Sequence, residues 1–342
     1  MDLTNTIEIK KEFDTELKLK WENLEKNSNI HFFQTYKWQK YWYNNCGINR
    51  ENIIILYYKK KELISILPLN LKKKKFIKIL SWNGFPFSDY NQPITKKDRT
   101  FNNKDFEFII SKLYKKFKFD NIHFINCINC NYLSKNKFLS NNFSRLIFFK
   151  DESHNLIINN LKKKINYDIN RLKKNYNLEI SINSSNNKKQ IIDFFINEKF
   201  KQLKRTGAWN YLKFREFKNY IINLSDLNSE NLCFSYLKIN DVIISCHIGY
   251  KFDNKYYYIF PAYNIDFKKY SAGKILLYKL IENYKLQNYQ IFDFTTGNEL
   301  YKKKLNNFIG NTYEYITYSS LLGIIYYTKI RLKRMIKSLF IN

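Results

Sequence analysis

A short segment near residue 300 combines the residue types that acid–base chemistry requires. Asp293 lies inside an aromatic run that predicts a β-strand over 291–294, where a charged side chain is costly unless it is paired or functional. A polar loop, residues 295–297, follows this strand, and open α/β sheets usually bind ligands beyond the carboxyl ends of their strands. Tyr301 and Lys302 follow closely enough to turn back over the same place. The alternative is that Asp293 caps a turn and that Lys302 is solvated surface.

A second candidate site lies upstream, where a predicted strand leads into a predicted helix. Small residues at a helix start let a ligand approach the backbone, and the unpaired N–H groups and the helix dipole there attract phosphate. The residues of this candidate anion site are Lys268, Lys269, Ser271, Ala272, Gly273 and Lys274. The alternative is an ordinary helix start with a serine N-cap.

His247 lies in the middle of another predicted strand and is one of only four histidines. A lone histidine in apolar surroundings is more often a satisfied core residue than a catalyst, so we keep it as a reserve base. The sequence contains no HxxH, HExxH, Walker or GxSxG pattern, which argues against metalloenzyme, nucleotidase and hydrolase chemistry. Cys127 and Cys130 form a CxxC without a second ligand pair, so we expect no metal site.

The elements that must position these residues fall into two halves. Apolar patterns in the first half predict elements near 12–26, 38–43, 53–58, 63–71, 76–82, 106–117, 122–126 and 145–149. Those in the second half predict elements near 161–176, 189–204, 232–239, 242–250, 255–262, 273–286, 291–294 and 312–319. We expect domains over residues 1–155 and 156–320, each with a mixed, mostly antiparallel sheet flanked by helices, in an α/β (α+β) fold.

The two halves echo each other at a spacing of 179 residues. The predicted strand that begins at Glu51 corresponds to one that begins at Glu230. The acid that ends the following turn is Glu62 in the first half and Asp241 in the second. Each half then continues with a helix and a short strand. A duplicated α/β unit explains this order, and chance similarity of apolar strands is the competing explanation.

The composition of the chain constrains its class. It has 342 residues and a net charge of +29, because 59 Lys and Arg outnumber 30 acids. Such a charge suits nucleic acid, anionic lipid or phosphorylated ligands, although Lys, Asn and Ile enriched from end to end also indicate an AT-rich genome. The sequence has no transmembrane stretch, and its first twenty residues are too polar for a signal peptide. We therefore expect a cytoplasmic protein.

The last predicted element, residues 321–342, is a basic amphipathic helix. Its apolar residues share one face, and Lys and Arg fill most of the remainder. A helix of this kind can lie on an anionic membrane at the inner surface of the cell. An ordinary helix packed on the body of the protein is the alternative.

Several residues and short segments occur in an order that resembles a known family. They are Trp38, Trp42, the segment 66–69, Asp89, Tyr90, Arg171, the segment 270–274, Asp293, Phe294, Gly297, Tyr301 and Lys302. Over most of its length the chain resembles the GNAT-related acetyltransferases of the CelD/BcsL-like type. These are associated with cellulose and other polysaccharide biosynthesis and are related to the FemAB peptidyltransferases.

This resemblance implies tandem GNAT-like halves and an active site in the second. It implies transfer from acetyl-CoA or another acyl-CoA to an amine or hydroxyl of a sugar or cell-envelope polysaccharide precursor, with no metal. A GNAT reaction needs a base and a proton donor rather than a protein nucleophile. Asp293 is then the expected base and Tyr301 the expected proton donor. Lys302 is expected to hold the carboxylate or the acceptor.

The candidate anion site departs from the general GNAT phosphate loop, which starts with Arg or Gln and has Gly three residues later. Here Lys268 and Ser271 occupy those places. The donor therefore stays open between acyl-CoA and the aminoacyl-tRNA that FemAB enzymes use. A FemAB-like transferase with tRNA as partner, or a non-catalytic nucleic-acid-binding relative, is the alternative function.

Overall fold

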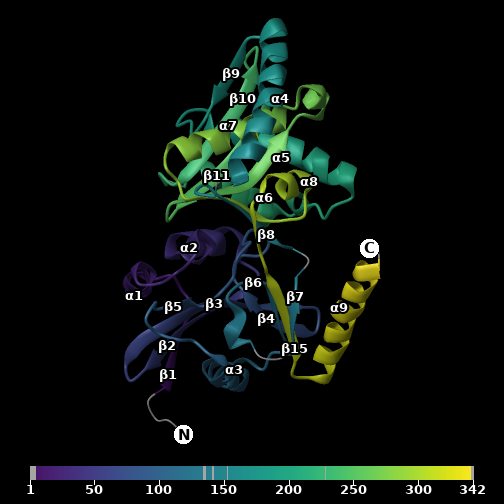
Figure 1. The fold of residues 1–342 in the computed structure, drawn as a ribbon. Helices are drawn as coiled ribbons and strands as arrows, with labels where there is room; N and C mark the ends of the chain where they lie inside the picture. The colour runs from purple at the N-terminus through teal and green to yellow at the C-terminus, as the bar shows by residue number, and fades with distance from the viewer. Residues whose placement is uncertain (1–4, 134–135, 141, 152, 228, 340–342) are drawn as a thin grey trace. The chain divides into compact units, whose positions relative to one another are not determined.

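The computed structural model describes residues 5–133, 136–140, 142–151, 153–227 and 229–339, which Figure 1 shows as a ribbon. The chain divides into two compact units. The first unit contains residues 1–141 and 311–342, and the second contains residues 142–310. Among the described helices, none combines the length and apolar composition that spanning a bilayer requires.

The first unit is built on one mixed sheet with the strand order β1-β2-β3-β4-β6-β15-β7, and β5 pairs with β3. Its strands are β1 (Asn5–Lys10), β2 (Glu51–Lys59), β3 (Glu62–Lys74), β4 (Ile77–Trp82), β5 (Ile94–Thr95), β6 (Asn121–Cys127), β7 (Lys137–Leu139) and β15 (Tyr313–Tyr318). Its helices are α1 (Thr15–Lys26), α2 (Tyr36–Cys46), α3 (Asn103–Phe117) and α9 (Leu321–Leu339). Only β4 and β6 are parallel among the paired strands of this sheet.

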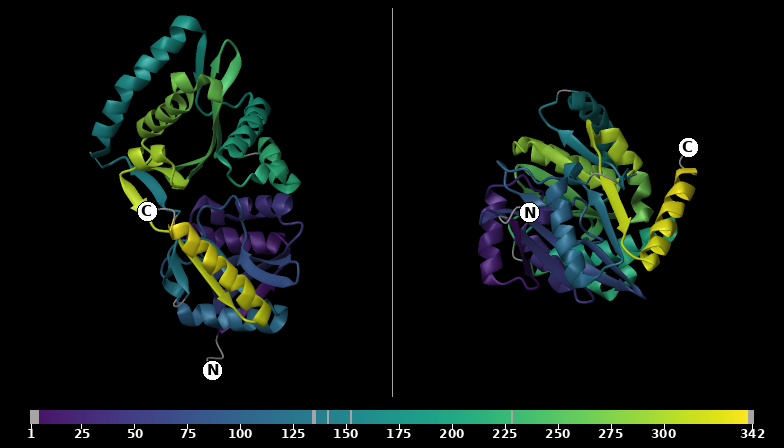
Figure 2. Two further views of the ribbon diagram at one scale, coloured as in Figure 1. Left: turned by 90° about the vertical axis from the view of Figure 1, so that its right-hand side faces the viewer. Right: turned by 90° about the horizontal axis from the view of Figure 1, so that it is seen from below.

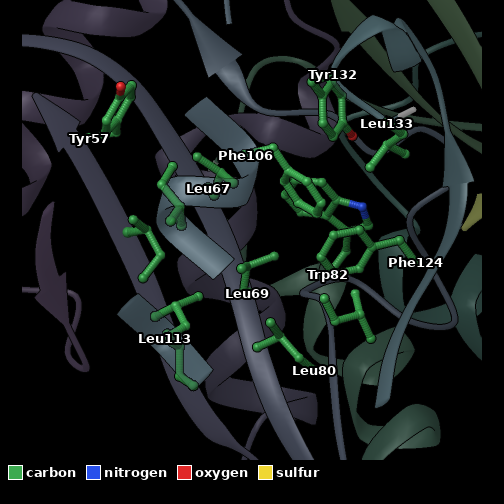
Figure 3. Packing of buried hydrophobic residues seen from close by; sticks show 14 of the residues in the cluster. Tyr57, Leu67, Leu69, Leu80, Trp82, Phe106, Leu113, Phe124, Tyr132 and Leu133 are labelled. Carbon is green, nitrogen blue, oxygen red and sulfur yellow. The ribbon is translucent and has the colours of Figure 1, made fainter. Parts of the chain in front are cut away.

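The core of the first unit forms where α3 packs against this sheet. Figure 3 shows the leucines of β3 and β4 beside the rings of Trp82, Phe106 and Phe124. The rings of Trp82 and Phe124 lie 4.8 Å apart, from neighbouring parallel strands. Aromatic pairs of this kind bury large areas and fix the packing of the layer.

The second unit repeats this arrangement with the strand order β14-β8-β13-β12-β11-β10-β9. Its strands are β8 (Ser144–Phe148), β9 (Leu178–Ser181), β10 (Leu232–Ile239), β11 (Val242–Phe252), β12 (Lys255–Tyr263), β13 (Ile291–Thr296) and β14 (Phe308–Gly310). Its helices are α4 (Ser153–Asn175), α5 (Lys188–Thr206), α6 (Arg215–Ile222), α7 (Ala272–Leu286) and α8 (Leu300–Leu305). The left view of Figure 2 shows α4 and α7 on one face of the sheet and α5 and α6 on the other.

The expected mixed α/β fold with mostly antiparallel sheets is confirmed, and the two sheets share one topology. In each, a hairpin leads to a strand, a crossover helix and a parallel strand: β2-β3-β4-α3-β6 and β10-β11-β12-α7-β13. Tyr57 lies opposite Ser65 in the first hairpin, and Leu237 lies opposite Ser245 in the second. Residues at equivalent places in the two sheets are therefore separated along the chain by one residue more than the spacing of 179 seen in the sequence. A shift of one residue in a strand exchanges its two faces.

Two strands lie in the other unit from the one that the sequence predicts, so the boundaries of the units differ from those predicted at residues 155 and 320. β8, expected to end the first half, pairs with β13 in the second sheet. β15, expected to close the second sheet, pairs with β6 in the first. Each fills the equivalent place beside the parallel strand of the other unit. The helix expected over 321–342 corresponds to α9. Residues 340–342 of the expected span lie outside the described chain.

Candidate functional site

The second unit contains a cavity where two parallel strands separate. The pairing of β12 with β13 ends at Tyr257 and Asp293, and β12 continues beyond this point along the cavity. The cavity has a volume of about 320 Å3. It is lined by Lys199, Gln202, Ser245, Cys246, Tyr258, Pro261, Ala262, Tyr263, Lys268, Ser271, Ala272, Gly273, Lys274, Leu277, Glu299 and Tyr301. Five of the six residues of the predicted anion site are among them.

The start of α7 forms one wall of this cavity. Ser271 precedes the helix in a left-handed conformation, with φ of 57°, and its side chain makes no capping hydrogen bond. The Lys274 N–H donates to the Ser271 carbonyl over 2.8 Å. The Lys274 N–H is therefore not available to a ligand in this conformation. The N–H groups of Ala272 and Gly273 remain available to bind a ligand, because the first N–H groups of an α-helix have no acceptor within the helix.

Gly273 keeps the cavity wall close to the backbone of α7. A Cβ atom at this position would lie 3.2 Å from Cδ1 of Tyr263, which lines the cavity. A larger side chain would therefore have to move the Tyr263 ring or enter the cavity. This is the close approach that the small residues of the segment predict.

Three lysines of the predicted anion site have different positions. Lys268 and Lys274 line the cavity and supply positive charge beside the helix start. Lys269 is not among the lining residues, and its ammonium lies 5.0 Å from the ring of Tyr270. The structure therefore assigns Lys269 to packing around Tyr270.

Tyr301, on α8, also lines the cavity. Its ring packs against Tyr258 and Phe294, with centroids 6.4 and 6.3 Å apart. Burial raises the pKa of the Tyr301 hydroxyl well above its ordinary value, and the neighbouring Tyr258 and Glu299 add to the effect. The hydroxyl therefore keeps its proton at neutral and mildly basic pH.

Lys302 is buried and holds the loop after β13. Its ammonium donates to the Thr296 carbonyl over 2.8 Å and lies 3.3 Å from the Glu299 carboxylate. It is not among the residues that line the cavity. Arg145 of β8, which the sequence did not single out, donates to the Gly297 carbonyl over 3.1 Å. Both cations thus fix the backbone that carries Glu299.

Asp293 is buried and does not line the cavity. Its carboxylate accepts a hydrogen bond of 2.7 Å from the Thr295 N–H. Thr295 has a φ of 59°, so the strand turns sharply just after Asp293. This geometry matches the turn-capping alternative for Asp293.

His247 is fully buried between two tyrosines of β12. Its ring stacks on Tyr258 at 4.0 Å, and Nδ1 shares a hydrogen bond of 2.9 Å with the Tyr256 hydroxyl. Burial lowers the pKa of His247 well below its ordinary value, so the imidazole is neutral. His247 does not line the cavity, and its position fits a core histidine.

Two ionisable residues reach the cavity without having been predicted from the sequence. Lys199 extends from α5, and burial lowers its pKa to about 8. Glu299 lies at the start of α8 and is half exposed. No motif marks Lys199 among the many lysines of the chain. Glu299 lies within the segment that the sequence marks for chemistry, between the loop and Tyr301. Among the described side chains, no three His, Cys, Asp or Glu residues come together as a metal site requires.

The equivalent helix start in the first unit is closed. Asn102 caps α3 by accepting from the Asp105 N–H, and Asp105 accepts from the Asn102 N–H in return. The Asp105 carboxylate also accepts from the hydroxyl of Tyr57 over 2.7 Å and from the ammonium of Lys59 over 2.9 Å. A carboxylate at this place occupies the N–H groups and repels an anion.

Comparisons with known proteins find a matching domain and similar folds. Residues 159–303 match the family described as acetyltransferase (GNAT) domain. No curated protein sequence matches the chain. The solved structure of FemX has 11% identity and a TM-score of 0.57, and the match covers 88% of this chain and 96% of FemX.

Two further solved structures match this chain over almost the full length of both chains. A tandem GNAT protein from the clavulanic acid biosynthesis pathway has 7% identity and a TM-score of 0.53, with 92% of this chain and 99% of that chain covered. The structure of L-PGS from Bacillus licheniformis has 11% identity and a TM-score of 0.53, with 97% and 99% covered. At these identities the likeness describes the fold. The chain therefore has the fold of tandem GNAT proteins, and residues 159–303, within its second unit, match the GNAT acetyltransferase domain.

Proposed function

We propose that the second unit transfers an acyl group from an acyl-CoA, such as acetyl-CoA, to an amine or hydroxyl acceptor. The observation that carries the proposal is the cavity along β12, which is lined both by the start of α7 and by the buried phenol of Tyr301. Ala272 and Gly273 offer N–H groups to the pyrophosphate, and Lys268 and Lys274 offer positive charge. Tyr301 lines the same cavity and supplies a proton for the leaving thiolate.

The reaction needs no covalent enzyme intermediate. The acceptor nitrogen or oxygen attacks the thioester carbonyl carbon, and the C–S bond breaks as the tetrahedral intermediate collapses. The thiolate takes its proton from the Tyr301 hydroxyl. The acceptor gives its proton to the Lys199 amine, whose pKa of about 8 leaves part of it neutral near pH 8. Solvent then returns the proton from Lys199 to Tyr301.

A sugar amine or hydroxyl of a cell-envelope polysaccharide precursor is the acceptor class that we propose. The resemblance to polysaccharide-biosynthesis acetyltransferases supports this class, and we propose that the reaction takes place in the cytoplasm, where acyl-CoA is made. Glu299 supports an amine in particular. Its carboxylate is half exposed at the cavity, so it can attract and orient a cationic acceptor before the proton is lost.

Aminoacyl transfer from tRNA is the second candidate function. The FemX-like fold and the net charge of +29 favour it. A tRNA donor would contact the protein mainly through its phosphates, so its affinity would depend steeply on salt. An acyl-CoA in a cavity carries few phosphates and depends on salt much less.

Calorimetric titration separates the two candidates. We expect acetyl-CoA to bind saturably to the full chain at low and at physiological salt, with similar affinity. Deacylated tRNA is expected to bind weakly, if at all, once salt is raised. Tight, stoichiometric tRNA binding at physiological salt without acetyl-CoA binding would replace the acyl-CoA proposal with the aminoacyl one.

A further inference from the structure

The C-terminal helix α9 docks on the first sheet through polar side chains. Figure 1 shows α9 beside β15, and its carbonyl at Gly323 accepts from the Asn121 side chain over 2.9 Å. Arg334 pairs with Glu314 of β15 and donates to the Leu139 carbonyl over 2.8 Å. Tyr326 shares a hydrogen bond of 2.9 Å with His123 of β6. The inner face of the helix is therefore the polar one.

The outer face of α9 is apolar, the reverse of an ordinary surface helix. Leu321, Ile325, Leu332 and Ile336 recur at helical spacing and are 82, 66, 53 and 56% exposed. Met335 beside them is 60% exposed. An apolar row of this length on a protein surface marks a place of interaction. The helix does pack on the body of the protein, as the alternative states, but these apolar side chains stay exposed.

The charge around this row is of one sign. Lys329 and Lys333 are exposed beside it on α9. The chain has no Asp or Glu after Glu314, and Glu314 is held by Arg334 and His123. The partner of this face must therefore be apolar in part and negatively charged.

A second element of the first unit lies beside α9. The β3–β4 hairpin carries Lys72, Lys73, Lys74 and Lys75, all exposed, and Phe76 at its tip is 83% exposed. The ammonium of Lys74 lies 5.9 Å from the ring of Tyr326, so the hairpin lies beside α9. An exposed aromatic ring among lysines is suited to the boundary between lipid headgroups and acyl chains.

We propose that the outer face of α9 and the tip of the β3–β4 hairpin bind the surface of an anionic lipid bilayer. The apolar row enters the boundary between headgroups and acyl chains, and the lysines contact anionic headgroups. A second copy of the chain fits less well. A symmetric contact of this face with itself would bring lysines together without an acid on the described part of α9 to pair with them. The inference is independent of the acyl-transfer proposal.

Vesicle sedimentation of the full chain tests this surface. We expect binding to vesicles of phosphatidylcholine with phosphatidylglycerol, and little binding to phosphatidylcholine alone. The triple variant Ile325→Gln, Leu332→Gln, Ile336→Gln should lower the partition coefficient on anionic vesicles by about tenfold or more. These side chains are exposed, so thermal unfolding should stay unchanged. The matched control is Leu19→Gln on α1, also in the first unit and 65% exposed, and it should bind as the parent does.

A second variant, Lys329→Glu with Lys333→Glu, tests the contribution of the positive charge. It should abolish the preference for anionic vesicles and leave unfolding unchanged. Equal binding by the parent, the triple variant and Leu19→Gln would overturn the proposal. So would a concentration-dependent dimer that the triple variant abolishes while vesicle binding is absent, because the face would then be a contact between copies.

Discussion

Asn102 and Ser271 precede the equivalent crossover helices of the two units, and only Asn102 caps its helix. The Asn102 side chain accepts from the Asp105 N–H, and Asp105 completes the reciprocal pair. Ser271 adopts a left-handed conformation and makes no such bond. The duplicated fold thus has a closed helix start in one unit and an open one in the other. This difference assigns donor binding in our proposal to the second unit alone.

Tyr301→Phe removes the proposed proton donor and keeps the ring that packs on Tyr258 and Phe294. We expect turnover to fall by about a hundredfold, while the dissociation constant for acetyl-CoA and the melting temperature stay close to those of the parent. Steady-state kinetics and calorimetry measure both. Since burial raises the pKa of Tyr301, the parent should show no loss of activity from this group near pH 10. Full turnover in the variant would mean that solvent protonates the thiolate.

Glu299→Gln and Asp293→Asn distinguish a cavity carboxylate from a structural one. Glu299→Gln should raise the KM for an amine acceptor by about tenfold and leave acetyl-CoA binding unchanged. Asp293→Asn should lower stability by about 1–3 kcal/mol, because the Thr295 N–H loses a charged acceptor. Denaturant unfolding and kinetics on both variants test this. If Asp293→Asn is as stable as the parent but turns over about a hundredfold more slowly, Asp293 is the base that the sequence suggests.

Much of the second unit could be predicted from residue types alone. The α7 segment was found because glycine and alanine beside lysines at a helix start have a direct physical use. The loop after β13 was found because its strand carries a lone acid. The roles of Asp293 and Lys302 depend on which way buried side chains face. The pairing of β13 with its neighbours and the packing of α8 decide this, and neither is visible in the sequence.

The sequence could not predict to which sheet β8 and β15 belong. β8 and β15 are short strands whose apolar patterns fit either sheet. Their assignment follows from pairing with β13 and β6, which is a tertiary property. Lys199 was missed for a related reason. Nothing local distinguishes it from the other lysines of α5 until that helix packs beside β12.

Lys199 should make stability depend on pH. Burial lowers its pKa to about 8, whereas a lysine in the unfolded chain titrates near 10.4. The unfolded state therefore binds the proton more tightly, so Lys199 destabilises the fold at pH 7, and this cost disappears as the pH rises from about 8 to about 10.4. Lys199→Met should raise the free energy of unfolding at pH 7 by on the order of 1 kcal/mol.

The expected gain from Lys199→Met shrinks toward pH 10, where the parent lysine has lost its proton. Urea unfolding of both proteins across this range isolates the effect, because the many tyrosines titrate alike in each. A gain that does not change with pH would show that Lys199 is solvated and protonated in the fold. Lys199 would then be no candidate for the base.

The most direct test of the account is calorimetric titration of Gly273→Val with acetyl-CoA. The new side chain meets the Tyr263 ring and blocks the approach of the pyrophosphate to α7, so affinity should fall by about tenfold or more. Leu286→Val places the same side chain at the exposed far end of α7 and should bind as the parent does. Folding is checked by thermal unfolding of all three proteins. Parent affinity in folded Gly273→Val, or no acetyl-CoA binding by the parent, would contradict a donor site at the start of α7.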